Sequence, residues 1–407
     1  MGFLFFDIII KKATNKGTYI MITKFKTIKT GIGFDFDVEF KNKKINCIIG
    51  KNGIGKTQLL ENMAKSLFFS HSMFLKDKKY KYGSVFYQKK IYDKLKDYTL
   101  KLPIGIEINN QIIKDENRDK WRYVDFKNIQ IKNKNFVCDK PIVFVGAQNR
   151  GFTKNIDTEN IKILPDSQGR FVDSINRSFS YLNGNGLENE EIANWFVSRL
   201  ILNPNFVTHS ENKTNEVITI LKLIEKLEPS LKLIKDNQLS ILYHNGELLF
   251  DGTPLDKLST GFISIIKIFQ EIIASYGGWS NENDLSQIDG IVFIDEIEAH
   301  LHISWQTKII NILKQFFPNT TFYISTHSPL VLAGLKDGEA YELYKDSDFV
   351  KTKNIENIEN YFLNDIVKEF FGVDLNKNKI ENYDNNKTNK AKKKLNELLE
   401  VLKETEK

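Results

Sequence analysis

Cysteine and long apolar runs are both scarce in this 407-residue chain. Its two cysteines, Cys47 and Cys138, lie in apolar, strand-like runs, which favours buried thiols in a reducing compartment over a disulfide framework or a metal site. No run of about 18 or more uncharged apolar residues occurs, so we expect no membrane-spanning helix and a cytoplasmic location. A net charge of +6 is small for this length and does not by itself indicate a nucleic-acid partner.

The first ten residues are apolar, yet they also lack what an export signal needs. They have no basic start and no small-residue cleavage site, and lysines come only afterwards, at Lys11 and Lys12. We expect an extra strand here, or a start extended upstream of Met21. The remaining composition, 41% hydrophobic and 27% charged, is that of a globular protein with one composite domain or two.

The most informative stretch is residues 50–57, GKNGIGKT, which fits the phosphate-loop pattern G-x-x-x-x-G-K-[ST]. An apolar, strand-like run precedes it and a helix-like run follows, as the motif requires. Its glycines let backbone N–H groups and a helix start point at phosphate oxygens, while the lysine reaches the β- and γ-phosphates and the threonine binds Mg²⁺. The predicted nucleotide-binding residues are Gly50, Lys51, Asn52, Gly53, Ile54, Gly55, Lys56, Thr57 and Gln58.

Three further apolar runs end in polar side chains, at the edge where ligands of open α/β sheets bind. Residues 291–294 are followed by Asp295, placed beside Mg²⁺, and by Glu296, placed to take a proton from the attacking water. Residues 321–325 lead to His327, which can donate to a γ-phosphate. Residues 141–145 lead to Gln148, which could bind Mg²⁺ or water, or simply cap its strand.

Leu258–Phe262 opens a strongly apolar helix over Ile263–Ala274. A serine and a glycine at a helix start form a second anion site, because the first N–H groups there have no helical partners. Ser259, Thr260 and Gly261 are the predicted contacts. An ordinary helix start explains these five residues equally well. The support for an anion site therefore comes from the position of this motif in the chain relative to the phosphate loop and the acidic strand end.

Two aromatic features admit two interpretations each. Phe25 and Phe34, in a predicted hairpin before the phosphate loop, could stack on adenine, although core packing explains them better. The segment from Lys76 to Lys101 carries nine lysines against three acids, interleaved with tyrosines and phenylalanines. That mixture can track a nucleic-acid backbone while rings stack on bases, but a solvated face with aromatics turned to the core is favoured.

The rest of the chain predicts mainly helices. Helical spacing runs from about 183 to 236, and a strand pair follows around a turn at residues 244–246. A helix is expected at Leu363–Phe371, and a leucine stripe over residues 395–402 should dock on the body.

Taken together, these motifs resemble the ATP-binding-cassette class of ATPases. Within that class, residues 295–302 (DEIEAHLH) and 325–329 (STHSP) look like the group that includes overcoming-lysogenization-defect nucleases, RecF-type ATPases and the ATPases of Septu-type and retron-associated anti-phage systems. The resemblance covers roughly residues 20–65, 140–150 and 255–335. Phe262 departs from it, because many relatives carry Glu or Gln at that position.

The resemblance implies an ATPase with ATP and Mg²⁺ as cofactors. Two heads would meet head to tail, with each ATP between one phosphate loop and the partner's Ser259, Thr260 and Gly261. Thr57, Gln148 and Asp295 would hold Mg²⁺, and Glu296 and His327 would be catalytic. His300 would lie in a loop crossing the dimer interface.

The implied fold is α/β: a mixed central sheet with flanking helices and an antiparallel lobe, carrying an inserted helical lobe. We expect the first part of the head at 1–150, the helical insertion at 151–250, the second part of the head at 251–345 and a helical tail at 346–407.

Several functions compete within this class. A transporter motor is disfavoured because Ser259 lies 202 positions after Thr57, and a DNA clamp because no sustained heptads exist. Only 80 residues follow His327, without a carboxylate cluster for a nuclease. We therefore expect an anti-phage ATPase sensor, a homodimer or higher oligomer, that controls a partner nuclease of the HNH type or similar. The alternatives are a RecF-like repair ATPase that binds DNA directly, and a nucleotide-gated scaffold with negligible turnover.

Overall fold

The computed structural model divides the chain into two compact units, Met1–Asn360 and Tyr361–Lys407, which are described separately. The opening segment 1–20, nearly all of the lysine-rich run and the leucine stripe over 395–402 lie outside the described residues. The structure describes residues 21–28, 33–42, 44–74, 99–100, 102–103, 105–114, 124–125, 136–148, 150–151, 164–184, 190–200, 213–235, 238–244, 247–282, 284–374, 377 and 393–394.

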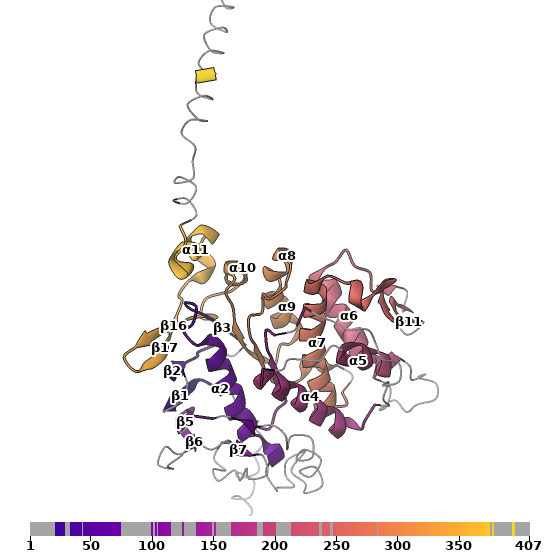
Figure 1. Cartoon of the computed structure of the whole chain (residues 1–407), viewed down its shortest axis with the longest axis horizontal. Coiled ribbons are helices and arrows are strands. Elements are labelled where there is room, and N and C mark those ends of the chain that lie inside the picture. The colour runs from indigo at the N-terminus through magenta and orange to yellow at the C-terminus, as the bar shows by residue number, and fades with distance from the viewer. Residues whose placement is uncertain are drawn as a thin grey trace, which may run out of the picture. The chain divides into compact units, whose positions relative to one another are not determined.

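A ten-stranded mixed sheet organises the first unit (Figure 1). Its strands, in spatial order, are β6 (Gln111–Lys114), β5 (Gly105–Ile108), β1 (Lys24–Ile28), β2 (Asp35–Glu39), β17 (Phe349–Asn354), β16 (Ala340–Asp346), β3 (Ile45–Ile49), β15 (Thr321–Ser325), β14 (Ile291–Ile294) and β8 (Ile142–Val145).

The half of the sheet from β16 to β8 is parallel throughout. Strands β3, β8, β14 and β15 are buried along their whole length, as expected for apolar runs that helices cover on both faces. Because they run in one direction, their carboxyl ends meet at one edge. The other half is largely antiparallel, and β1 alternates half-buried and buried residues. The predicted α/β class and mixed sheet are confirmed.

Helices pack on both the sheet and one another. The helices of the first unit are α2 (Lys56–Phe69), α4 (Ser167–Leu182), α5 (Glu190–Leu200), α6 (Thr214–Leu227), α7 (Thr260–Trp279), α8 (Ile303–Gln306), α9 (Ile309–Phe316) and α10 (Pro329–Leu332). Short strands outside the main sheet are β4 (Thr99–Leu100), β7 (Val124–Asp125), β9 (Ile234–Lys235), β10 (Gln238–Leu239), β11 (Ile241–His244), β12 (Glu247–Phe250) and β13 (Thr253–Pro254). The hairpin of β11 and β12 confirms the predicted strand pair.

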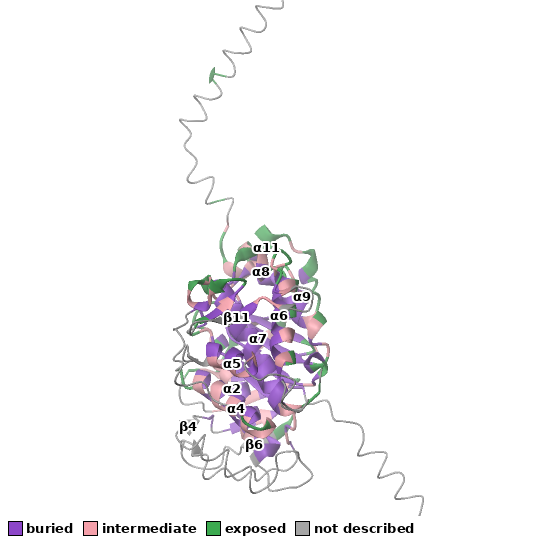
Figure 2. Cartoon of the chain, turned by 90° about the vertical axis from the view of Figure 1, so that its right-hand side faces the viewer, coloured by how far each residue is buried: buried purple, intermediate pink, exposed green. Residues whose placement is uncertain are grey.

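Helix α7 is the core helix of the unit, since every residue from Gly261 to Gly278 is buried (Figure 2). Helices α4 and α6 and strand β8 pack around it. Helix α4 lies within the helical insertion expected at 151–250, but ahead of the helical spacing recognised from about residue 183. Asp166 caps its start by accepting from the Gly169 N–H at 2.7 Å. Among the described residues, no helix is long and apolar enough to cross a membrane.

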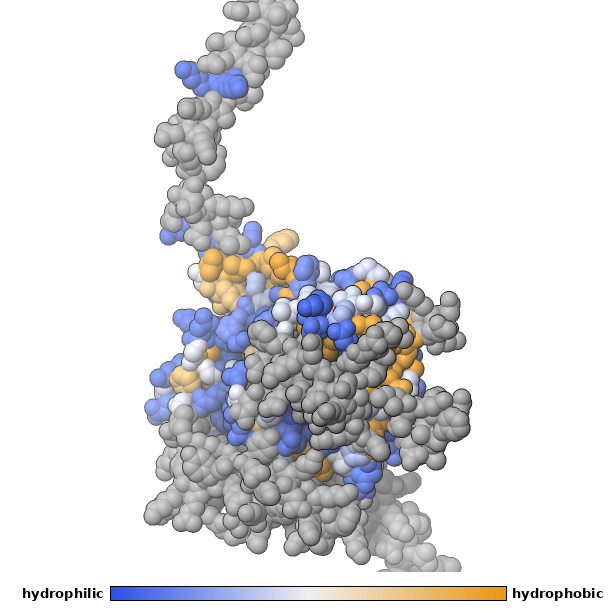
Figure 3. All heavy atoms as spheres, turned by 45° about the vertical axis from the view of Figure 1, so that its right-hand side comes forward, coloured by the Kyte–Doolittle hydropathy of each residue, from blue (hydrophilic) through white to orange (hydrophobic). Residues whose placement is uncertain are grey.

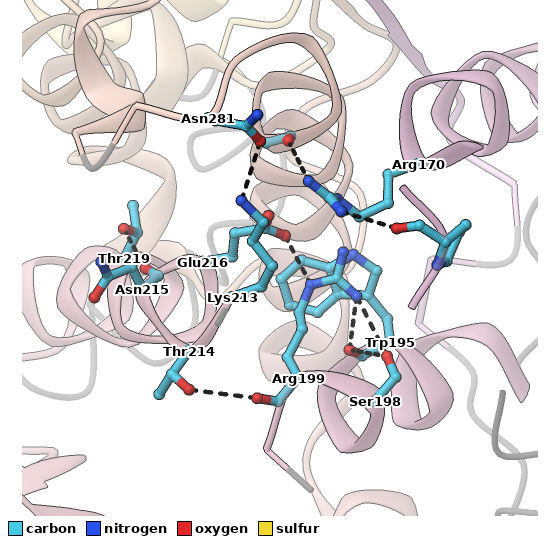
Figure 4. Close-up of polar contacts among 12 residues, drawn as sticks. Arg170, Trp195, Ser198, Arg199, Lys213, Thr214, Asn215, Glu216, Thr219 and Asn281 are labelled. Atoms are coloured by element: carbon cyan, nitrogen blue, oxygen red, sulfur yellow. Dashed lines mark hydrogen bonds and ion pairs between the residues drawn. The ribbon is translucent and has the colours of Figure 1, made fainter. Parts of the chain in front are cut away.

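Two buried ion pairs join the helices around α7. Arg199 of α5 donates to Glu216 of α6 at 2.7 Å, and the side chains are only 4% and 3% exposed. The Arg199 guanidinium also lies 3.8 Å over the Trp195 ring (Figure 4). Arg177 of α4 donates to Glu271 of α7 at 2.9 Å. Burial raises the pKa of Glu271, and the charge of Arg177 opposes that shift.

The second unit contains the predicted helix α11 (Leu363–Phe371), which ends at Gly372 in a left-handed conformation (φ 70°). Ile366 is fully buried, whereas Phe362 is 79% exposed, with Leu363 and Val373 also exposed. Figure 3 shows apolar residues gathered into orange patches on the face in view.

We predict that Arg199→Met strongly destabilises the first unit. It leaves the Glu216 carboxylate buried without its partner, a change that costs about 3–5 kcal/mol. Urea unfolding followed by circular dichroism measures the effect. Lys351→Met is the control, since its ion pair with Asp346 is solvent-exposed and should leave the midpoint almost unchanged. Equal midpoints for the two variants would contradict the assigned role of the buried pair.

Candidate functional site

The phosphate-loop residues follow β3 and lead directly into α2, as predicted. Lys56 is the first residue of the helix and is only 6% exposed. Its Nζ donates to the carbonyls of Gly50 at 2.8 Å and Lys51 at 3.3 Å, so the side chain folds back over the loop. Burial lowers the pKa of Lys56, while the nearby carboxylates of Glu296 and Asp295 oppose the shift. The loop therefore carries a fixed, partly desolvated cation.

Gly55 shows why this loop needs glycine. Its φ is 98°, and a Cβ there would lie 2.8 Å from Cδ2 of Phe34. A side chain would thus be strained in its backbone and would collide with the neighbouring ring. The close packing of Phe34 on the loop depends on this position.

Asp295, which follows β14, is hydrogen-bonded to the start of α2 and to the end of β15. The Thr57 hydroxyl donates to its two carboxylate oxygens at 3.1 and 2.9 Å, and the Ser325 hydroxyl donates to Oδ1 at 2.5 Å. Asp295 itself is 4% exposed. The hydroxyl and the carboxylate are the hard oxygen donors that Mg²⁺ prefers, and phosphate oxygens and water would complete its shell. The residues present therefore fit a magnesium ion held by Thr57 and Asp295.

Glu296 follows in a left-handed backbone conformation, with φ 44°. Its N–H donates to the Ser325 hydroxyl at 2.8 Å. Its carbonyl accepts a hydrogen bond from Nη2 of Arg150, which is fully buried. Burial lowers the pKa of Arg150, and negative charges that include Asp295, Glu298 and Glu296 oppose that shift.

Glu298 shapes the turn that carries His327. Its carboxylate accepts from the Thr326 hydroxyl and from the His327 N–H, both at 2.6 Å. These two bonds fix the backbone at the end of β15. The His327 side chain lines the same cleft as the phosphate loop.

One cleft of about 750 Å³ is lined by part of the phosphate loop together with Glu296 and His327, while Asp295 is not among its lining residues. That size suits a nucleotide. Phe34 also lines it, whereas Phe25 is fully buried in the core. The lining residues are Phe34, Asn52, Gly53, Gly55, Lys56, Thr57, Gln58, Glu61, Glu296 and His327.

The predicted signature lies at the start of α7. Ser259 caps the helix by accepting from the Phe262 N–H at 3.2 Å, and Ser259 and Thr260 are exposed. Gly261 is buried, and a Cβ there would lie 2.6 Å from the carbonyl oxygen of His300. None of the three signature residues lines the cleft described above.

Gln148 and the two histidines of the DEIEAHLH stretch also lie away from the cleft lining. Gln148 is exposed beyond β8, with its Oε1 4.0 Å from the Cβ position of Gly184. His302 caps α8 by accepting from the Ser304 N–H. Within the described ranges, no cluster of three histidine, cysteine or acidic side chains could hold a metal.

Four residues of the site were not singled out from the sequence: Ser325, Glu298, Glu61 and Arg150. Ser325 and Glu298 stand inside the motifs that were recognised, so their position was available as a signal. Arg150 also stands in a recognised stretch, 140–150, but nothing there pointed to its contact with Glu296, from which 146 sequence positions separate it.

The chain is similar to one protein family and to several known proteins. Residues 174–333 match the family described as "AAA domain, putative AbiEii toxin, Type IV TA system". The chain is 26% identical to Septu protein PtuA of Bacillus thuringiensis over 355 residues, which are 82% of this chain and 80% of that protein. It is 31% identical to the Retron Ec83 probable ATPase of Escherichia coli over 179 residues, 36% of this chain and 32% of that protein.

Among solved structures, the SMC head domain from Thermotoga maritima is similar with a TM-score of 0.37 and 12% identity, over 83% of this chain and all of that one. The sequence relatives confirm the resemblance to Septu and retron ATPases that the motifs indicated. The family match begins after the phosphate loop, and its range includes the signature helix, the β14 strand end and the His327 turn.

We predict that Phe34→Ala weakens ATP binding at least roughly 5-fold, because stacking of a base on an aromatic ring contributes about 1–3 kcal/mol. Binding of a fluorescent ATP analogue measures the change. Phe34→Trp keeps the stacking surface and should retain affinity. Phe25→Leu is the control and should lower stability without weakening binding by the purified folded protein. Unchanged affinity in Phe34→Ala would leave Phe34 as a packing residue only.

Proposed function

We propose that this chain, a relative of the Septu and retron ATPases, binds ATP with Mg²⁺ and hydrolyses it in the cleft between α2, β14 and β15. One observation carries the proposal: the Thr57 hydroxyl and the Asp295 carboxylate meet within 2.9 Å, although 238 residues separate them. This contact joins the phosphate loop to the acidic strand end. Lys56, Glu296 and His327 border the same cleft.

Each side chain has a chemical task in this proposal. Lys56 and the loop N–H groups bind the β- and γ-phosphates. Mg²⁺, when bound, neutralises phosphate charge that develops during transfer. The Glu296 carboxylate accepts a proton from the attacking water, and His327 donates to the γ-phosphate. Gln148 would have to turn from its exposed position to take part.

A complete site in this proposal needs a second copy of the chain. Ser259 and Thr260 are exposed and, with Gly261, lie outside the lining of the cleft. The exposed start of α7 is a natural anion site, because its first N–H groups lack helical partners. In a head-to-tail homodimer it would face the γ-phosphate bound by the other subunit. Assembly beyond the dimer is compatible with this arrangement.

The biological role that we propose is that of a cytoplasmic sensor subunit in anti-phage defence. Its support is the similarity to Septu and retron proteins over 82% and 36% of this chain. In this role ATP turnover would control a separate nuclease of the HNH type or similar.

We predict that Glu296→Gln retains ATP affinity but lowers turnover by roughly 100- to 10,000-fold, the usual contribution of a general base. Lys56→Ala should instead weaken binding itself. Phosphate release and nucleotide binding are measured for both variants and for the wild-type protein. Turnover of Glu296→Gln at the wild-type rate would show that the base is wrongly assigned.

The partner model predicts that the purified protein hydrolyses ATP while leaving plasmid DNA and RNA intact. Incubation with Mg²⁺ or Mn²⁺, with and without ATP, tests this, and addition of the partner nuclease should start cleavage. Glu296→Gln protein serves as the matched control for ATP dependence. Cleavage by the purified chain alone that disappears in Asp295→Ala would overturn the model. Tight DNA binding without a nuclease partner would favour the RecF-like alternative.

A further inference from the structure

The catalytic turn at Glu296 is held in a costly conformation. A glutamate with φ 44° lies in the left-handed region, which residues other than glycine, asparagine and aspartate rarely occupy. Such a conformation is energetically unfavourable and persists only where surrounding contacts fix it. The turn must therefore have strong restraints on both sides of Glu296.

The first restraint is Ser325, which accepts from the Glu296 N–H at 2.8 Å while donating to Asp295. The second is Arg150, whose Nη2 donates to the Glu296 carbonyl. The amide before Glu296 and the amide after it are thus each held by one side chain. Together these bonds fix the direction in which the Glu296 side chain leaves the backbone.

Arg150 is unusual because it is 0% exposed yet forms no ion pair within the described residues. Among these residues, its Nε and Nη1 also lack hydrogen-bond partners. A fully buried cation with a single carbonyl partner is expensive. Burial lowers the pKa of Arg150, and nearby groups that include Tyr181, Asp295 and Glu298 oppose this shift. The buried charge of Arg150 thus interacts favourably with the acidic groups at the end of β14.

The chain beside Arg150 restrains the following loop as well. A Cβ on Gly151 would lie 3.0 Å from Cγ of His300, so this ring packs directly on the Gly151 backbone. From the opposite side, Gly261 approaches the His300 carbonyl and the Ser264 hydroxyl donates to the Ala299 carbonyl at 3.0 Å. The segment after β8 and the start of helix α7 therefore both contact the loop at Ala299 and His300.

We propose that Arg150 is a positioning residue for ATP hydrolysis, which holds the strained Glu296 turn so that the carboxylate points at the attacking water. This inference rests on the proposed function. Arg150 does not line the cleft and makes no contact with it that would bind nucleotide. Its loss should therefore lower the rate of hydrolysis and leave nucleotide binding nearly unchanged.

The test compares Arg150→Met, Arg150→Lys and wild-type protein by kcat, KM and affinity for an ATP analogue. For Arg150→Met we expect kcat to fall roughly 100-fold, the effect of misplacing a reacting group by about 1 Å, with KM and affinity within a few-fold of wild type. Arg150→Lys keeps a cationic donor for the Glu296 carbonyl and should recover part of kcat. Arg150→Met added to Glu296→Gln should cause little further loss, because the arginine acts through Glu296.

The matched control is Arg170→Met. Arg170 is 7% exposed and likewise donates only to backbone carbonyls in the described structure, those of Pro165 at 2.9 Å and Gly277 at 3.2 Å. It should lower the unfolding midpoint while the folded protein keeps its kcat. The inference is overturned if Arg150→Met keeps the wild-type kcat. It is also overturned if Arg170→Met loses as much kcat as Arg150→Met at an equal folded fraction, or if the losses of kcat from Arg150→Met and Glu296→Gln are fully additive. Failure of the proposed function is distinct: the wild-type protein, or Glu296→Gln, would then give the wrong turnover before any Arg150 variant is considered.

Discussion

The hydrogen bonds to the Asp295 carboxylate are the interactions on which the candidate site depends. Thr57 comes from the phosphate loop after β3, Ser325 from the end of β15, and Asp295 from the end of β14. Parallel pairing brings these three ends to one edge, but pairing alone sets only their neighbourhood. The hydrogen bonds to the Asp295 carboxylate then fix the positions of Thr57 and Ser325 relative to Asp295. Lys56, Glu296 and His327 then share one cleft because their backbones are attached to these three strands.

A second feature is the amount of charge buried around α7. The Arg199–Glu216 pair joins α5 to α6, and the Arg177–Glu271 pair joins α4 to α7, in a region where apolar side chains would pack at lower cost. Breaking either pair leaves an uncompensated charge, so these helices are constrained to specific relative positions. The signature residues stand at the first turn of α7, and any displacement of that helix reaches them directly.

The sequence predicted the parts of the site that are local and missed those that are distant. The phosphate loop, Asp295–Glu296 and His327 were found because each motif is contiguous and follows a buried strand. Phe34 lines the cleft whereas Phe25 is buried in the core, and the alternation of apolar and polar residues along the strands could not tell which of the two would do so. The role of Arg150 could not be predicted, because it depends on a hydrogen bond to Glu296, which lies 146 positions further along the chain. The predicted roles of Gln148 and of the signature in a dimer stay predictions, and the lysine-rich run lies almost wholly outside the described residues.

The way Lys56 folds over its own loop has a consequence for the thermodynamics of binding. A free lysine side chain loses up to about 2 kcal/mol of rotamer entropy when it is immobilised. Here the bonds from Nζ to the Gly50 and Lys51 carbonyls have already fixed the side chain before a ligand arrives. An ammonium group has three protons, so one donor is still available to an incoming phosphate oxygen. The loss of Lys56 rotamer entropy thus occurs during folding. Binding of a phosphate then pays little further entropy for ordering this side chain, so the affinity for phosphate is higher than a mobile lysine would give.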